Sequence, residues 1–196
     1  MNHALLEELL ALQQRDTDTR SRLLAEDRLY GDYAEEMQQV HRANAERLAH
    51  IIAVHGWPGR TLVGTDGAGA AWLIAQHAIC TPDLQRGFLA HLESAVAQGE
   101  APPRQLAYLM DRIRFNEERP QRYGLVLDWD TDGQLNCTVE DPEHLDARRA
   151  AIGLPPFAGD LARHRAAVAA EGGHCPEDYA AYQARRRAWA RHVEWV

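Results

Sequence analysis

Apolar side chains recur every three or four residues along most of the chain, and this helical period restricts the fold more than any other feature of the sequence. The segments that show it first are about 4–26, 33–54, 65–80, 82–98 and 102–115, with Gly31 and Asp32 separating the first two. A period of two occurs only in 125–139, where Asp132-Gly133 supplies a hairpin turn. Helical segments return at about 140–153, 158–170 and 176–196. The pattern predicts a mainly α fold, a multi-helix bundle with one β-hairpin near residues 123–139.

The length and composition suit one domain. A chain of 196 residues with 45% hydrophobic content can bury one sizeable core. No shift in composition and no linker divides the sequence, so we predict a single domain over 1–196. The last helical segment, about 176–196, can be read as an element appended to that domain.

The charge of the chain restricts its partners. The formal net charge is −8, and every basic side chain except histidine is arginine because the sequence has no lysine. Schiff-base chemistry on lysine is therefore excluded. The acidic balance opposes nucleic-acid binding, which depends on a basic face. We expect a small-molecule or peptide partner and no nucleic acid, and a homo-oligomer stays open.

Neither a membrane span nor a signal peptide is expected. No apolar run approaches the ~20 residues that a membrane helix needs, and residues 1–8 are acidic where a signal peptide is basic. Cys80, Cys137 and Cys175 are few and far apart, which argues against a disulfide framework and a Cys-x-x-Cys metal knuckle. We expect a cytoplasmic protein with no membrane partner.

Two histidines flank a loop rich in glycine and proline that begins after His55. His55 lies on the apolar face of one predicted helix, and His77 lies on the apolar face of the next. Both imidazoles are therefore predicted to point into the core. Trp57 precedes a proline in the loop, and we expect it to cover the core beside His55.

Other polar residues could share a pocket with these histidines. The candidate catalytic residues are His55, His77, Asp111 and Arg112. An imidazole, a carboxylate and an arginine for an anionic group are sufficient for acid–base chemistry. The candidate ligand-binding residues are Asp16, Arg20, Asn44, Trp57, Gln76, Gln121 and Tyr123. Plain antiparallel pairing would leave His55 and His77 on the order of 15 Å apart, so a shared pocket requires crossing helices or a loop that folds back.

Two of these candidates also have structural interpretations. Asp16 and Arg20 have the spacing of an acid-before-base helix pair, for which a surface ion pair is the favoured interpretation. Asn44 lies on an apolar stripe, where a buried amide needs partners. It either satisfies the backbone or a neighbouring helix, or it holds a ligand or orients His55.

The sequence allows a metal site but does not favour one. Inward histidines could bind a metal ion together with an acid from another helix, such as Asp16 or Asp111. However, no His-x-x-x-His or Glu-x-x-His pair places two ligands on one helix. No metal ligand is therefore assigned, and the cofactor stays unknown.

Five ordered motifs give the chain a family resemblance. They are His55-Gly56-Trp57-Pro58, Ala71-Trp72-Leu73 with Gln76-His77, Leu109-x-Asp111-Arg112, Gln121-Arg122-Tyr123-Gly124, and Asp146-x-Arg148-Arg149 with Gly153-Leu154-Pro155-Pro156. Over roughly residues 4–162 the chain resembles an uncharacterised bacterial family known only as a domain of unknown function. The resemblance implies a shared fold and site but no chemistry. The family continues its Tyr-Gly motif with Thr-Gln, whereas Leu125-Val126 follow here, so a ligand contact through that glutamine would be missing or altered.

Two functions from different classes fit these observations. The first is an enzyme of small-molecule or peptide metabolism, hydrolase- or transferase-like, with acid–base chemistry in a His/Asp/Arg pocket between helices. The alternative is a non-catalytic helical interaction module whose buried polar network is structural. An enzyme should expose His55 or His77 to a partly solvated pocket, whereas a scaffold should bury both. A ring in bulk solvent would contradict the helical-stripe argument and favour the module.

Overall fold

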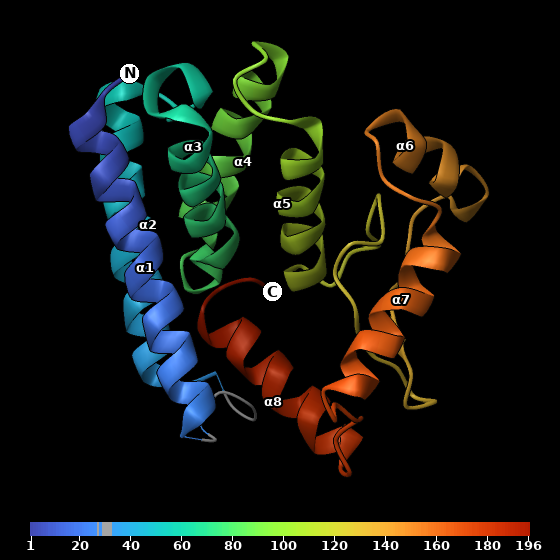
Figure 1. Cartoon of the computed structure of the whole chain (residues 1–196). Coiled ribbons are helices and arrows are strands. Elements are labelled where there is room, and N and C mark those ends of the chain that lie inside the picture. Colours follow the sequence, from blue (N-terminus) through green and yellow to red (C-terminus); the bar gives the residue numbers. More distant parts are fainter. Residues whose placement is uncertain (27, 29–32) are drawn as a thin grey trace. The chain divides into compact units, whose positions relative to one another are not determined.

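The computed structural model describes residues 1–26, 28 and 33–196. The predicted break at Gly31 and Asp32 lies outside the described residues. The chain divides into two compact units, residues 1–106 and 107–196, and each is described by itself. The described part is mainly helical with one two-stranded hairpin, which confirms the predicted fold class (Figure 1). No helix in those ranges is long and apolar enough to cross a membrane.

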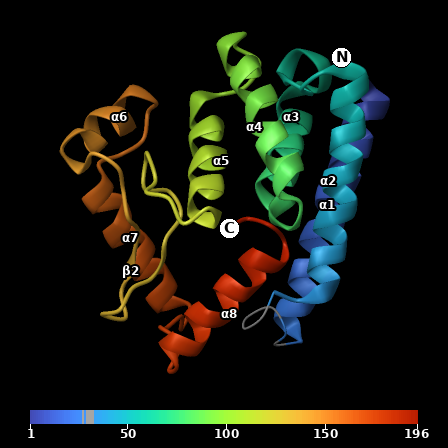
Figure 2. The same cartoon turned by 180° about the vertical axis from the view of Figure 1, so that it is seen from behind.

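Three long helices form the body of the first unit, and both views show them side by side (Figures 1 and 2). They are α1 (His3–Ala25), α2 (Glu35–His55) and α3 (Arg60–His77). The unit is completed by the short helix η1 (Ala78–Cys80), by α4 (Pro82–Ala97) and by the first turn of α5 (Pro103–Asn116).

The directions of the three long helices decide which residues meet. The backbone N–H of Asn2 donates to the carbonyl of Leu62, at the starts of α1 and α3, and further along Asp16 contacts His77. α1 and α3 are therefore parallel. The short loop 56–59 reverses the chain, so α2 runs against α3. The first turns of α2 consequently lie beside the last turn of α3.

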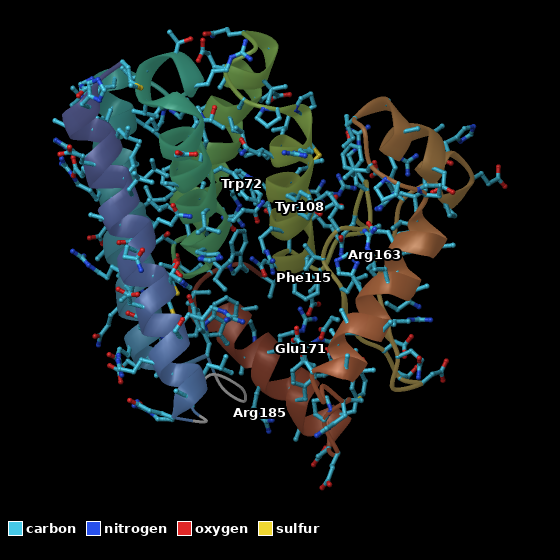
Figure 3. All side chains as sticks on the ribbon, viewed as in Figure 1. Trp72, Tyr108, Phe115, Arg163, Glu171 and Arg185 are labelled. Carbon is cyan, nitrogen blue, oxygen red and sulfur yellow. The ribbon has the colours of Figure 1, made fainter. Side chains whose placement is uncertain are left out.

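The apolar stripe of α1 packs on a face of α3 made mostly of small residues. The buried positions of α1 are Leu5, Leu9, Leu12, Asp16, Thr19 and Leu23. Those of α3 are Val63, Gly67, Ala68, Ala70, Ala71, Ile74, Ala75 and Gln76. On the other side of α3, Trp72 points toward α5 and donates its indole N–H to the backbone oxygen of Gln105 (3.0 Å; Figure 3).

α3 begins earlier than the sequence pattern indicates. We predicted a loop up to Thr65, but the helical turns start at Arg60 and are interrupted only at Gly64. Gly64 has φ 71° and ψ 177°, a backbone conformation that glycine adopts without steric cost. The chain therefore makes a kinked helix where a loop was expected.

The second unit contains the rest of α5, the hairpin and the remaining helices. β1 (Asp128–Trp129) pairs antiparallel with β2 (Leu135–Asn136), with Asp128 opposite Asn136. The helices that follow are η2 (Pro142–His144), α6 (Leu145–Ala151), α7 (Phe157–Ala170) and α8 (Tyr179–His192).

The strands are shorter than the predicted run 125–139. Side chains form hydrogen bonds with the backbone N–H and C=O groups of the residues that precede β1. Gln121 accepts the N–H groups of Leu125 and Val126 and donates to the carbonyl of Val126. These groups are then not free to form a strand ladder. The hairpin of the second unit therefore starts only at Asp128.

Candidate functional site

A buried carboxylate, Asp16, meets two imidazoles in the first unit. Asp16 comes from α1, and only 3% of its side chain is exposed. Its Oδ2 accepts a hydrogen bond from Nδ1 of His77, the last residue of α3, over 2.6 Å. The same oxygen lies 3.2 Å from Nε2 of His41, in the second turn of α2. One ligand atom from each of the three residues lies within 4.8 Å of the other two. We call Asp16, His41 and His77 the three-residue cluster.

His41 is held by polar neighbours on its other side. The hydroxyl of Tyr33 hydrogen-bonds to Nδ1 of His41, and the thiol of Cys80 donates to that hydroxyl over 3.3 Å. The ring centroids of His41 and His77 are 4.9 Å apart. A polar chain therefore runs from Cys80 through Tyr33 and His41 to Asp16.

The members of the cluster differ in their access to solvent. The His41 side chain is 10% exposed, whereas that of His77 is 33% exposed. His77 is therefore the member of the cluster that is most accessible to solvent.

The charges of the cluster follow from burial and from mutual contact. Burial by itself raises the pKa of Asp16, but the interactions with His41 and His77 outweigh it and hold that pKa well below its ordinary value. Burial lowers the pKa of His41. At neutral pH the carboxylate is ionised and His41 is neutral. Burial also raises the pKa values of the Tyr33 hydroxyl and the Cys80 thiol, so both keep their protons.

The local sequence places Asp16 and His41 on buried helix faces. Asp16 follows Leu12 by one helical turn on the stripe of α1, and His41 precedes Asn44 by nearly one turn on the stripe of α2. Nδ2 of Asn44 donates to the carbonyl of Leu12 over 3.1 Å. This predicted ligand residue thus joins α1 to α2 one turn from the cluster.

The structure contradicts the predicted pair of inward histidines. His55 ends α2 and is exposed, whereas His77 is half-buried. His55 lies next to the loop at the start of α3, and His77 lies at the opposite end of that helix of 18 residues. The predicted pocket containing both histidines is therefore wrong. The histidine of α2 that lies beside His77 is His41, near the other end of the helix, and not His55.

The predicted surface pair of Asp16 and Arg20 is also wrong. Arg20 is exposed, while Asp16 lies on the buried face of α1 and contacts the two histidines. Trp57 is half-buried, beside an exposed rather than an inward His55. Gln76 is buried, one residue before the cluster member of α3. Arg112 is half-buried in the second unit.

The remaining predicted candidates belong to the second unit and bind its own backbone. Asp111 is fully buried, and its carboxylate accepts N–H groups from Arg122, Tyr123 and Leu125 at 2.8–3.3 Å. Gln121 is 2% exposed and bonds to the backbone a few residues further along. Asp111 and Gln121 therefore hold the Gln-Arg-Tyr-Gly turn in shape. The Tyr123 side chain is half-buried.

The second unit also has a cavity of about 490 Å³, lined by the end of α5, the hairpin and α8. Gln121 is the one predicted candidate among its lining residues. The guanidinium of Arg186 lies 4.9 Å from the ring centroid of Phe115, which Figure 3 labels at the end of α5, and it also approaches Glu118 and Asp128. The arginines of the wall are already paired with carboxylates. The cavity therefore does not define the chemistry of a ligand.

Sequence reasoning missed three polar residues of this site. A signal for His41 was present, because it lies seven residues before Leu48 on the stripe predicted to be buried. Tyr33 and Cys80 lie at the edges of helices, where periodicity does not indicate the direction of a side chain.

These features define a mainly helical protein in which three helices enclose two imidazoles and one carboxylate. The model of DUF6624, described as a family of unknown function, matches residues 3–167. The chain belongs to this family, which confirms the family resemblance. The match includes the whole cluster and ends within α7, before α8. No curated protein and no solved structure matches the chain.

Proposed function

We propose that the chain is an enzyme of small-molecule or peptide metabolism that carries out acid–base chemistry, hydrolase- or transferase-like, at Asp16, His41 and His77. The observation that supports it most is the position of Asp16. This carboxylate is almost wholly buried, yet it faces two imidazoles, one of which is one-third exposed. Such a cluster can take a proton from a bound water or substrate hydroxyl and return it.

The energetics of burial support a functional role for the cluster. Taking a carboxylate out of water is unfavourable unless it is paired, and apolar residues of similar volume often stabilise a fold as well as a buried ion pair does. Helices that meet only to pack could do so through apolar residues, which occupy most of the other buried positions of α1 and α3. Titratable groups held at one partly accessible point are typical of functional sites.

The second candidate is a helical interaction module with a structural polar network. Two observations favour it: the polar chain from Cys80 through Tyr33 to His41 is bonded internally, and His55 points to solvent. The partial exposure of His77 favours the enzyme instead. A cytoplasmic location and a small-molecule or peptide partner, with no nucleic acid, belong to the enzyme proposal.

The enzyme and the interaction module differ in whether the protein converts compounds into products. Purified full-length chain would be incubated with a bacterial small-molecule extract and with a mixture of short peptides, and the products followed by mass spectrometry. We expect at least one compound to be consumed by the wild type and by His55→Ala, an exposed histidine outside the cluster, but not by His77→Ala. Equal compositions after incubation with all three proteins would overturn the enzyme and leave the interaction module.

A further inference from the structure

We infer that Asp16, His41 and His77 form a binding site for a divalent transition metal ion, with Oδ2 of Asp16, Nε2 of His41 and Nδ1 of His77 as its ligands. The inference rests on the proposed function in one respect, since the ion would be the means by which this centre activates water. Ion binding itself is measured without any substrate.

The three residues offer ligand atoms that all lie within 4.8 Å of one another, and the two separations from Oδ2 of Asp16 are near those expected around a single ion. Nitrogen and oxygen ligands lie about 2.0–2.2 Å from zinc, so two ligands of one tetrahedral ion are separated by roughly 3.3 Å. Oδ2 of Asp16 lies 3.2 Å from Nε2 of His41 and 2.6 Å from Nδ1 of His77. The first separation already matches. The second needs to widen by about 0.7 Å, which replaces a hydrogen bond with two bonds to the ion.

His41 provides a second observation that points to a ligand. Its Nε2 is buried and makes no hydrogen bond within the described part of the chain, although a carboxylate oxygen lies 3.2 Å away. A buried ring nitrogen normally has a hydrogen-bond partner. The opposite nitrogen of the ring is held by the Tyr33 hydroxyl. Imidazoles that ligate metals are oriented in this way, through a polar partner on the nitrogen that does not bind the ion.

The donor set indicates the class of ion. Two imidazoles and one carboxylate suit Zn²⁺, Fe²⁺ or Mn²⁺, whereas Mg²⁺ and Ca²⁺ prefer oxygen ligands alone. Three protein ligands leave at least one position for water, as in catalytic rather than structural zinc sites. Of the three ligand residues, His77 is the most exposed to solvent. An ion at this site would lower the pKa of the bound water, so that the three residues would hold the ion and the bound water would give up the proton in the acid–base step.

The origin of the three ligands on three different helices also explains why the spacing of residues in the sequence did not favour a metal site. Each helix supplies one ligand, so no pair at a spacing of three or four residues exists to be found. The parallel course of α1 and α3 and the antiparallel course of α2 bring the three positions together. Ligands that converge in this way on a helical bundle are an established way of building a metal centre.

The test uses the full-length chain after removal of metals with a chelator and dialysis. It is titrated calorimetrically with Zn²⁺, Mn²⁺ and, without oxygen, Fe²⁺, with Mg²⁺ and Ca²⁺ as controls. We expect saturable binding of one transition ion per chain and none of the control ions. Asp16→Asn and His77→Ala should weaken that binding at least a hundredfold. His50→Ala and His55→Ala, which replace exposed histidines of α2, should leave it unchanged.

Folding of each variant is checked by circular dichroism, and the ion should raise the Tm of the wild type and of the two controls only. His77→Ala changes a half-buried residue and keeps the test valid if Asp16→Asn does not fold. No saturable binding of a transition ion, or binding that persists in His77→Ala, overturns the site. A protein that binds the ion but transforms no compound contradicts the proposed function alone. Activity that survives removal of the ion contradicts only the part of the inference in which the ion activates water.

Discussion

Gln85 of α4 donates its side-chain amide to the backbone of Gln76, one residue before His77. Nε2 of Gln85 lies 3.1 Å from the carbonyl oxygen of Gln76 and 2.7 Å from that of Ala75. The last carbonyls of a helix have no partner within the helix, so Gln85 satisfies the end of α3 from outside. The turn that carries His77 is thereby attached to α4.

We expect Gln85→Leu to destabilise the fold by about 2 kcal/mol, because the side chain is fully buried and the carbonyls of Gln76 and Ala75 would each lose a hydrogen bond, although Ala75 keeps the N–H of Ala78. Leucine keeps the volume, so the loss reports the hydrogen bonds. Unfolding in urea measures it. Gln39→Leu, at an exposed position of α2, is the control and should change the stability little. Equal effects of the two substitutions would contradict the role assigned to Gln85.

Asp111 should contribute to stability in the second unit through the three backbone N–H groups that it accepts. Asp111→Ala leaves the N–H groups of Arg122 and Tyr123 without their acceptor, whereas that of Leu125 keeps Gln121, and we expect a loss of about 2 kcal/mol or more. Asp111→Asn keeps one acceptor oxygen and should cost clearly less. The free energies of unfolding in urea show which of the two variants is less stable. Amide hydrogen exchange should also become faster at Arg122 and Tyr123 in the alanine variant. Unchanged exchange at these two amides would mean that the carboxylate does not hold the turn.

The parts of the fold that depend on residues close together in the sequence could largely be predicted, and the parts that depend on distant residues could not. Stripes at helical spacing identified α1, α2 and α4 within a few residues, since the buried positions of each helix repeat along it. The turn of α3 that precedes Gly64 was missed, because the glycines and the proline of the segment 56–67 indicated a loop. The strands were overestimated because acceptors for their backbone come from Asp111 and Gln121, which no alternation of residues reveals.

The candidate site was harder to predict because its contacts are distant in sequence. Asp16 lies on the buried stripe of α1, and although it was a candidate for the histidine pocket, its spacing of four residues from Arg20 favoured a surface ion pair. Its actual partner, His77, is 61 residues away. The choice between these partners depends on the direction of each helix, and a single stripe carries no information on direction. His55 was placed inside for the same reason: it shares the face of Leu48, but it lies at the exposed end of α2.

Glu100 should give the first unit a pH-dependent contribution at the start of α3. Its carboxylate accepts the hydroxyl (2.7 Å) and the backbone N–H (2.8 Å) of Thr61, in the first turn of that helix. These hydrogen bonds, that of the hydroxyl first, lower the pKa of Glu100 from its ordinary 4.5. A helix N-terminus also favours a negative charge.

Because the pKa of Glu100 is lower in the folded than in the unfolded state, its stabilisation is present above pH 4.5 and is lost as the pH falls through the folded value. Glu100→Gln should therefore be less stable than the wild type at pH 7, and by a smaller margin at pH 3. Urea unfolding at both values measures the difference, with Glu93→Gln on an exposed part of α4 as control. An NMR titration that gives Glu100 a pKa at or above 4.5 would contradict a stabilising role of its carboxylate at the start of α3.

The close approach of α1 and α3 should distinguish two glycines of α3. A Cβ added at Gly67 would lie 2.8 Å from the Cβ of Val63 and 2.9 Å from a methyl group of Leu6, whereas one added at Gly69 meets nothing within 4 Å. Replacing a helical glycine with alanine stabilises a helix by up to about 1 kcal/mol. Gly69→Ala should show this gain.

At Gly67 the same gain is opposed by overpacking, which costs about 1–3 kcal/mol when the neighbours cannot move. Leu6 has a flexible methyl group, but the Cβ of Val63 belongs to α3 itself and cannot yield without distorting the helix. Gly67→Ala should therefore be less stable than Gly69→Ala by at least about 1 kcal/mol in urea unfolding. Two variants of equal stability would show that Val63 and Leu6 both yield to the added methyl group.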